Sequence, residues 1–322
     1  MKKIIITGAT GFIGVHLIEK WIDRGAEIYA VVRPSSKNIA RLPKCSNVHV
    51  VELEMGCYEH LLNIVGDADF FYHLAWEGAR VPYRDDGLMQ SHNYDCAIQA
   101  YDTAKKLGCS FFLGSGSQAE YGSTTGLVDE KYPCNPTTEY GRYKFKAGMD
   151  LLERAKRDGI KLIWTRIFSL YGPYDFSKTL VMSSIDKMLK NEPVQMTEGI
   201  QLWDYLYVSD AAEAFVLLAE KKCDSGVYNI ASGEYKQLRS FVEDIKTVLK
   251  SESDLQFGVI PYGSNGPVNL MPDPSKIKSL GWLPAVGFYE GIRRISILLS
   301  LNKCKLSSSE ISFSFFGRRV ER

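Results

Sequence analysis

Apolar and polar residues follow two different patterns in the first half of the chain. Short runs such as Ile4–Ile6 and Phe70–Tyr72 are apolar without interruption, which is typical of strands covered on both faces. Longer stretches between them carry apolar residues at helical spacing. The expected strands are 2–7, 27–32, 48–52, 69–74 and 110–115, and helices are expected from about Phe12 and Ser91. Alternating strands and helices predict an α/β fold with a doubly wound parallel sheet.

The first expected strand runs into a turn in which every third residue is glycine. Such a turn lets backbone amides approach a pyrophosphate, and the N-terminus of the following helix adds partial positive charge. At the first strand-to-helix junction we therefore predict a Rossmann-type dinucleotide site rather than a tight turn without a ligand. Its cofactor-binding residues are Gly8, Thr10, Gly11, Phe12, Ile13 and Gly14.

Composition narrows the function to small-molecule chemistry. In 322 residues, 39 Lys and Arg nearly balance 38 Asp and Glu, so we expect neither nucleic acid nor a membrane surface as a partner. The apolar start breaks at Thr7 and Gly8, and no stretch is long enough to cross a bilayer. Seven scattered cysteines without a Cys-x-x-Cys pair fit a reducing cytoplasm, and the five dispersed histidines do not suggest a metal site.

Several further motifs, together with Gly-x-x-Gly-x-x-Gly, resemble the extended short-chain dehydrogenase/reductases, also called the sugar-nucleotide epimerase/dehydratase family. They are His73-Leu74-Ala75, Ser117, the Tyr140-to-Lys144 segment, Arg166 and Tyr171-Gly172-Pro173. The resemblance runs from Lys2 to about Ile292. It implies an NAD(P)-dependent oxidoreductase acting on a nucleoside-diphosphate sugar, with Leu74 and Ala75 beside the cofactor.

Ser117, Tyr140 and Lys144 are the predicted catalytic residues. A spacing of four puts Tyr140 and Lys144 on one helix face, where an ammonium can favour the phenolate of a phenol whose unperturbed pKa is about 10. The resemblance implies that Lys144 also reaches the nicotinamide ribose, and Ser117 is expected to hydrogen-bond the reacting oxygen. Tyr and Lys at this spacing also occur on ordinary exposed helices, so the assignment depends on all three residues and the glycine turn together.

The end of the second strand bears on the choice of cofactor. NAD-binding sites have an acid there, whereas this chain has Arg33, which could hold the extra phosphate of NADP. We predict NADP(H) over NAD(H) on this basis. Glu52 and Leu53 stand where the family has an Asp-hydrophobic pair for the adenine, although Glu52 could equally be a solvated charge.

The residues after Ser117 favour reduction over dehydration. Family dehydratases have an Asp-Glu pair there, but Gln118 and Ala119 cannot transfer protons, and Glu120 is one place too late on a segment expected to be strand-like. We therefore predict NADPH-dependent reduction of the C4 keto group of a nucleoside-diphosphate 4-keto-6-deoxy sugar. The alternatives are an epimerase with bound NAD, a reductase of a non-sugar carbonyl, and a cofactor-binding regulator without turnover.

The less regular second half is expected to bind the substrate. Strands are expected at 201–208 and 227–231 and helices at 180–188 and 238–250. Relatives carry an arginine for the diphosphate where this chain has Trp203, which packing alone could also explain, and an asparagine where it has Ser169. Lys178 or Arg239 could replace the missing cation. The predicted substrate-binding residues are Trp76, Gln118, Ser169, Lys178, Trp203 and Arg239.

These patterns divide the chain into a dinucleotide-binding domain at 1–168 and a smaller α/β substrate-binding domain at 169–303, parts of which return to the first sheet. Residues 304–322 match nothing in the family. His73, at the end of a buried strand, is expected to be a hydrogen-bonded imidazole, and Asn93 is expected to bind local backbone because asparagine disfavours helix interiors. The resemblance implies a homodimer through the helix with Tyr140 and the helix before it.

Overall fold

The computed structural model describes residues 1–263 and 266–307, with side chains as far as Leu301. Its larger region is a seven-stranded sheet in the order β12-β7-β5-β4-β1-β2-β3, with every neighbouring pair parallel. The predicted doubly wound sheet is therefore confirmed. Its strands are β1 (Lys3–Thr7), β2 (Glu27–Val32), β3 (Val48–Glu52), β4 (Phe70–His73), β5 (Phe111–Ser117), β7 (Lys161–Ile167) and β12 (Gly226–Ile230).

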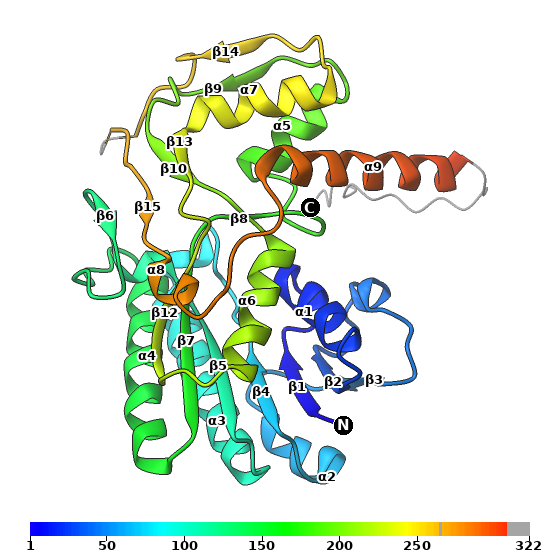
Figure 1. Cartoon of the computed structure of the whole chain (residues 1–322), viewed down its shortest axis with the longest axis vertical. Helices are drawn as coiled ribbons and strands as arrows, with labels where there is room; N and C mark the ends of the chain where they lie inside the picture. Colours follow the sequence, from blue (N-terminus) through cyan, green and yellow to red (C-terminus); the bar gives the residue numbers. More distant parts are fainter. Residues whose placement is uncertain (264–265, 308–322) are drawn as a thin grey trace.

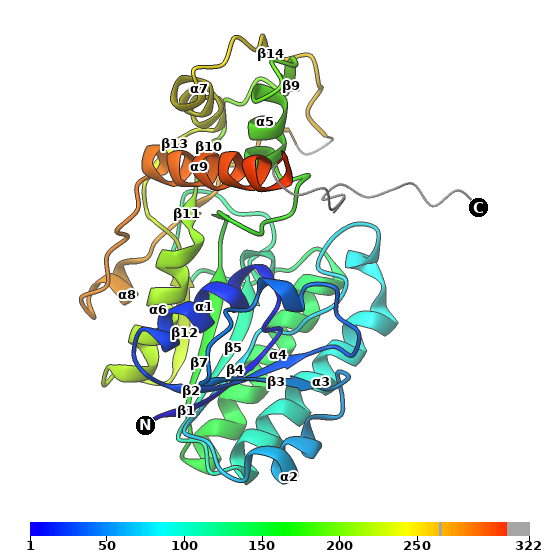
Figure 2. The same cartoon turned by 90° about the vertical axis from the view of Figure 1, so that its right-hand side faces the viewer.

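Helices cover both faces of this sheet (Figures 1 and 2). On one face α1 (Phe12–Ile22) packs beside α6 (Val208–Glu220), and on the other α3 (Gly87–Lys106) packs beside α4 (Glu139–Asp158), with the short α2 (Leu61–Val65) near α3. Each face has its own buried apolar cluster. The sheet is thus the middle layer of three, and its strand ends are fixed by packing on both sides.

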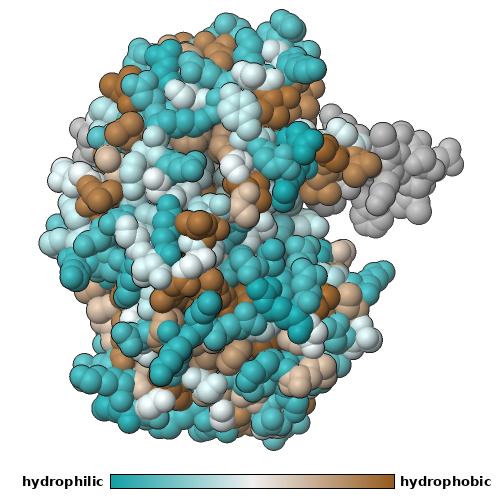
Figure 3. Space-filling view, viewed as in Figure 1, coloured by the Kyte–Doolittle hydropathy of each residue, from teal (hydrophilic) through white to brown (hydrophobic). Residues whose placement is uncertain are grey.

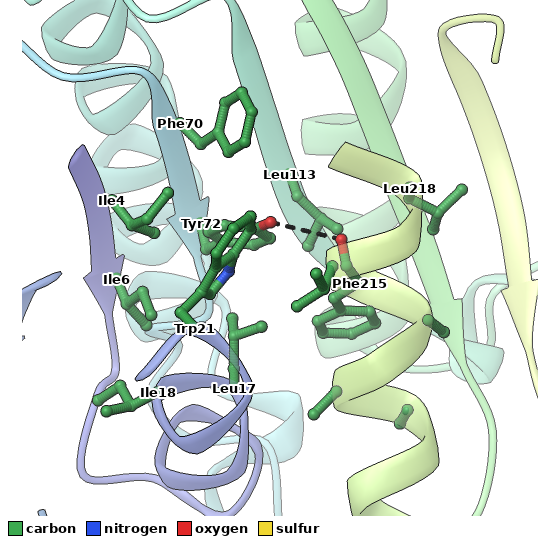
Figure 4. Packing of buried hydrophobic residues seen from close by; sticks show 14 of the residues in the cluster. Ile4, Ile6, Leu17, Ile18, Trp21, Phe70, Tyr72, Leu113, Phe215 and Leu218 are labelled. Atoms are coloured by element: carbon green, nitrogen blue, oxygen red, sulfur yellow. Dashed lines mark hydrogen bonds between the residues drawn. The ribbon is translucent and has the colours of Figure 1, made fainter. Parts of the chain in front are cut away.

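The core between α1, α6 and the sheet is shown in Figure 4. Trp21 of α1 lies against Phe70 and Tyr72 of β4, with ring centroids 5.7 and 6.1 Å apart. The Tyr72 hydroxyl donates to the backbone oxygen of Phe215 in α6 at 3.4 Å. The apolar runs singled out in the sequence are therefore the buried strands of this core.

A smaller region sits above the carboxyl ends of the strands (Figure 1). It has its own apolar cluster, centred on residues such as Ile185, Ile245 and Ile292. Its elements, with the short strands that join it to the sheet region, are β6 (Leu127–Val128), β8 (Leu170–Tyr171), α5 (Leu180–Met188), β9 (Val194–Met196), β10 (Leu202–Asp204), β11 (Leu206–Tyr207), β13 (Tyr235–Gln237), α7 (Leu238–Leu249), β14 (Leu255–Phe257), β15 (Met271–Pro272) and α9 (Phe288–Ser307). The short α8 (Ser275–Lys278) instead packs against β12 of the large sheet.

The expected strand 201–208 is wrong as a single element. The Asp204 carboxylate accepts hydrogen bonds from the backbone amides of Ser232, Gly233 and Glu234 and from the Ser232 hydroxyl. This buried carboxylate ends β10, and Val208 already belongs to α6. The hydrogen bonds of Asp204 with a segment distant in sequence therefore interrupt the strand that the local apolar pattern predicts.

Two boundaries also differ from the sequence prediction by more than one residue. Helix α3 begins at Gly87, four residues before the expected Ser91, because the Asp86 side chain accepts from the Met89 amide and caps it. Strand β5 extends two residues past the expected end, so that Ser117 is its last residue. Among the described residues no helix is long and apolar enough to span a bilayer. Of the predicted tail at 304–322, residues 308–322 lie outside the described residues.

Hydrophilic side chains cover most of the molecular face drawn in Figure 3, and hydrophobic ones occur in small groups. Because Figure 3 has the orientation of Figure 1, some of these hydrophobic groups can be seen to lie between the sheet region and the smaller region. The carboxyl edge of the sheet and the underside of the smaller region thus face one another, which is where ligands bind in open α/β sheets.

Candidate active site

Ser117 ends β5 and caps a single 3₁₀ turn, η4 (Gln118–Glu120). Its hydroxyl accepts from the Ala119 amide at 3.2 Å, and its own amide donates to the Glu120 carboxylate at 2.8 Å. The segment after Ser117 is therefore a turn and not strand-like as expected. This reciprocal capping fixes the position of the Ser117 side chain.

Glu120 points into the core. Its carboxylate is fully buried and accepts from Trp164 Nε1 at 3.0 Å and from Arg166 Nε at 2.8 Å, besides the Ser117 amide. Burial raises the pKa of Glu120, and the Arg166 guanidinium opposes this effect. With all these partners inside the protein, Glu120 holds the turn and does not face a substrate.

Tyr140 and Lys144 lie in the first turns of α4. The Thr138 hydroxyl caps the helix by accepting from the Gly141 amide at 3.1 Å. A Cβ at Gly141 would come within 2.4 Å of the Ala119 backbone oxygen, so glycine is needed for the helix start to touch η4. This contact brings the strand end with Ser117 against the helix turn with Tyr140.

Lys144 is buried beneath Tyr140. Its Nζ donates to the Ser115 backbone oxygen at 2.5 Å and lies 3.7 Å from the ring centroid of Trp76 and 5.9 Å from that of Tyr140. Burial lowers the pKa of Lys144 to about 7. Ammonium and amine forms are therefore both populated near neutral pH, as suits a group that supports proton transfer.

The Tyr140 hydroxyl is tuned by several neighbours. Burial raises the pKa of Tyr140, whereas hydrogen bonding with the Ser117 side chain and the nearby charge of Arg84 lower it. The Arg84 guanidinium carbon is 5.1 Å from the centre of the Tyr140 ring. The cation expected from the helical spacing was Lys144, so Arg84 is a neighbour that the sequence did not indicate.

An indole side chain sets the spacing between α4 and β5. A Cβ at Gly114 or Gly116 of β5 would come within 2.4 Å of Trp164 atoms, and one at Gly148 of α4 within 2.6 Å. Trp164 itself is fully buried in the neighbouring strand β7. The three glycines therefore make room for the Trp164 indole, which packs between β5, the strand of Ser117, and α4, the helix of Tyr140.

A cavity of about 650 Å³ opens at the carboxyl ends of β1, β2 and β4. Of the predicted cofactor residues, those that line it are Gly8, Thr10, Gly11, Arg33, Leu53, Leu74 and Ala75, and the predicted substrate residue Trp76 lines it too. Six other predicted cofactor residues do not belong to its lining, namely Phe12, Ile13, Gly14, Glu52, Tyr140 and Lys144. Ile13 packs into the core, and Glu52 accepts from the Ser35 amide at 3.3 Å.

The glycine turn fits a dinucleotide. Gly8 has a φ of +67°, and a Cβ there would come within 2.8 Å of the Ala75 amide nitrogen. A Cβ at Gly14 would come within 2.4 Å of the Gly8 oxygen, so the first turn of α1 packs directly on the loop. Neither position leaves room for a Cβ, as expected of a glycine turn that lets a pyrophosphate come close to the backbone.

Arg33 lies at the cavity with one partner already. Its Nη1 donates to the Glu77 carboxylate at 2.8 Å; the Arg33 side chain is largely exposed, and the Glu77 side chain is partly exposed. Glu77 is held by the buried Asn93, whose side chain accepts from the Glu77 amide and donates to its carbonyl oxygen. The predicted backbone role of Asn93 is thus confirmed.

His73 is buried as expected at the end of β4. Its Nδ1 is 2.9 Å from the Thr7 hydroxyl, whereas its Nε2 has no hydrogen-bond partner in the described structure. Burial lowers the pKa of His73 to about 3. The imidazole is therefore neutral and belongs to the floor beneath the glycine turn.

A second cavity, of about 180 Å³, lies between η4 and the smaller region. Two predicted substrate residues, Gln118 and Trp203, line it together with Ala119. Trp203 also packs against the apolar cluster around Tyr121 and Phe168, so it contributes to packing as well.

The other three predicted substrate residues line neither cavity. Lys178 is exposed on the loop before α5, and Arg239 lies over the Phe257 ring at 4.3 Å. Ser169 accepts from the Leu206 amide through its backbone oxygen. Neither lysine nor arginine at these positions therefore replaces the cation missing at Trp203 in this structure.

Sequence reasoning missed part of both linings. The loop between β4 and α3 contributes Arg80, Tyr83 and Arg84, the loop before α5 contributes Phe176, and the segment before β15 contributes Val268 to Leu270. These loops carry no periodic pattern or motif. Pro82, two residues before Arg84, indicates a turn, but no local signal indicates that this turn meets Tyr140.

Comparison with known proteins agrees with this geometry. The model of the NAD dependent epimerase/dehydratase family matches residues 4–231. The chain is similar to a putative UDP-glucose 4-epimerase of Methanocaldococcus jannaschii, with 27% identity over 306 residues that cover 91% of this chain and 96% of that protein. It is also similar to a dTDP-6-deoxy-L-talose 4-dehydrogenase (NAD(+)) of Aggregatibacter actinomycetemcomitans, with 25% identity over 269 residues that cover 81% and 96%.

Among solved structures, a UDP-N-acetylglucosamine 4-epimerase from Methanobrevibacter ruminantium shares the fold with a TM-score of 0.85 at 23% identity. The match covers 94% of this chain and 99% of that one. Since the family model spans more than half of the sequence and includes the glycine turn, Ser117, Tyr140 and Lys144, the chain belongs to the NAD-dependent epimerase/dehydratase family of nucleotide-sugar enzymes.

Proposed function

We propose that the protein reduces the C4 keto group of a nucleoside-diphosphate 4-keto-6-deoxy sugar with NADPH. The observation that carries this proposal is the chemistry of the second cavity. Gln118 and Ala119 line it where a dehydratase needs an acid and a base. The Glu120 carboxylate accepts hydrogen bonds from Ser117, Trp164 and Arg166 inside the core. A hydride transfer with one proton donor needs no such pair.

The chain's own residues supply the remaining steps. The bound nicotinamide cofactor provides the hydride. Tyr140 gives its proton to the carbonyl oxygen as that oxygen gains charge, and the Ser117 hydroxyl orients the oxygen. Lys144, buried below Tyr140, supports the resulting phenolate.

A panel of 4-keto-6-deoxy sugars linked to different nucleoside diphosphates tests this function. Each is incubated with NADPH or NADH while cofactor absorbance and product identity are followed together. Loss of NADPH equal to the amount of deoxyhexose formed supports the proposal. If no member of the panel reacts, the proposal is wrong, and non-sugar carbonyls become the substrates to examine.

Epimerisation with tightly held NAD is the second candidate, and the names of two similar proteins, both 4-epimerases, favour it. The name of a third similar protein, a 4-dehydrogenase acting on a 6-deoxy sugar nucleotide, favours redox chemistry at C4. The two candidates differ in cofactor balance. An isomer formed from a nucleoside-diphosphate sugar without net consumption of cofactor would establish the epimerase.

For the cofactor, we propose that Arg33 binds the extra phosphate of NADP. Glu77 uses one of its N–H donors, so the rest of the guanidinium fork is free to pair with a phosphate beside the cavity. Arg33→Asp is expected to weaken NADPH binding about tenfold or more and to leave NADH binding nearly unchanged. Fluorescence titration with both cofactors measures the ratio.

Lys37→Asp is the matched control, because it makes the same charge change on an exposed residue of the same loop outside the cavity lining. The control is expected to bind NADPH like the wild type. An unchanged ratio of NADPH to NADH affinity in Arg33→Asp contradicts the assignment and leaves NAD(H) as the cofactor.

We also propose that the protein is a cytoplasmic homodimer. The packing of α3 beside α4 on one sheet face provides a broad helical surface for a second copy. Light scattering coupled to size-exclusion chromatography checks this, and a mass near 36.2 kDa, that of one chain, would contradict it.

A further inference from the structure

The second cavity contains buried polar atoms that the described protein leaves without partners. They are Arg84 Nε, Gln118 Oε1 and Trp203 Nε1, and all three residues line this one cavity. A buried polar atom without a hydrogen bond costs about 1–3 kcal/mol, so proteins rarely keep several of them in one place without a use. Two donors and one acceptor on residues that line one cavity suit a ligand rich in oxygen atoms.

Arg84 differs from the other arginines of its surroundings. Arg33 pairs with Glu77, and Arg80 of the same loop lies 3.9 Å from the Asp175 carboxylate and over the Phe176 ring. Within the described part of the chain no carboxylate forms an ion pair with Arg84. Its charge is therefore available to an acceptor that the protein itself does not supply.

The position of Arg84 points to the sugar end of a substrate. Its guanidinium lies over the Tyr140 ring, and Tyr140 is the group that would protonate the reacting oxygen. The cavity of about 180 Å³ is much smaller than the neighbouring one of about 650 Å³ and has room for little more than a sugar ring. A diphosphate attached to that ring would lie farther from Tyr140.

We infer that Arg84 is a specificity-determining residue that donates a hydrogen bond from its side chain to a sugar oxygen of the substrate, with Gln118 and Trp203 completing the same polar subsite. This inference rests on the proposed function, because it takes a nucleoside-diphosphate sugar as the ligand. Gln118 cannot transfer protons, but in this subsite it binds the substrate through hydrogen bonds.

Calorimetric titration of Arg84→Gln tests the subsite directly. The probes are the glucose conjugates of UDP, dTDP, CDP and GDP and the four free nucleoside diphosphates, so that each pair isolates the contribution of the sugar. For the pair that the wild type binds best, the variant is expected to bind the sugar conjugate about ten- to a hundredfold more weakly and the free nucleotide equally well.

Arg142→Gln is the control, since it removes a positive charge from an exposed residue of α4 that pairs with Glu139 and lines neither cavity. It is expected to keep the wild-type ratio of the two affinities. An equal loss for conjugate and free nucleotide in Arg84→Gln would place the contact at the diphosphate and overturn the inference, as would no loss in either. If the wild type turns over a 4-keto-6-deoxy sugar of the panel but binds none of the glucose conjugates more tightly than the matching free nucleotide, the inference is wrong and the proposed function stands.

Discussion

Replacing Tyr140 by phenylalanine is expected to lower kcat by about 10²–10⁴-fold, the range for removing a positioned proton donor. The ring remains in place near Trp76 and the Arg84 guanidinium, because only the hydroxyl is lost. Cofactor affinity should therefore stay near the wild-type value. Steady-state kinetics on a substrate found with the panel, combined with fluorescence titration of NADPH, measures both quantities.

Tyr143→Phe provides the control on the same helix. Tyr143 packs near Tyr94 of α3, with 6.4 Å between ring centroids, so the loss of its hydroxyl should leave kcat within about twofold of wild type. A Tyr140→Phe enzyme that retained most of its kcat would show that another group donates the proton.

The second large effect concerns the buried pair of Glu120 and Arg166. Glu120→Ala leaves the nearly inaccessible Arg166 guanidinium without its carboxylate and removes the acceptor for Trp164 Nε1 and the Ser117 amide. Breaking one partner of a buried pair costs about 3–5 kcal/mol in free energy of unfolding. Urea denaturation followed by circular dichroism should show a correspondingly lower midpoint.

An exposed pair between α3 and α4 serves as the comparison. Asp102 and Arg154 lie 3.4 Å apart with both side chains partly in solvent, so Asp102→Ala should change the free energy of unfolding by at most about 1 kcal/mol. Equal effects of the two substitutions would mean that the Glu120 network contributes no more than a surface pair. Activity of any folded Glu120→Ala protein should also fall, because Ser117 loses the contact that fixes its amide.

The sequence predicted those parts of the molecule in which one local signal determines the structure. Ile4–Ile6 and Phe70–Tyr72 became buried strands because an uninterrupted apolar run fits a sheet covered on both faces. The turn at Gly8 was predictable because its positive φ and the close approach of Ala75 both require glycine. Tyr140 and Lys144 share a helix face through their spacing alone.

The substrate cavity was less predictable because its walls come from segments that are distant in sequence. Arg84 meets Gln118 and Trp203 only after the loop before α3, the turn after β5 and strand β10 have been brought together. Loop conformation has no periodicity from which such a meeting could be read. For the same reason Lys178 and Arg239, chosen for their charge, lie elsewhere.

The indole of Trp164 links residues that could otherwise vary independently. Because a Cβ at Gly114 or Gly148 would collide with Trp164 atoms alone, a larger side chain at either position can be accommodated only if position 164 becomes smaller. Related enzymes should therefore show paired exchange, with alanine or serine at the glycine positions where the tryptophan has been lost. In a protein with only one of the two substitutions, the strand end with Ser117 would be displaced relative to the helix with Tyr140. Its activity would therefore fall before its solubility does.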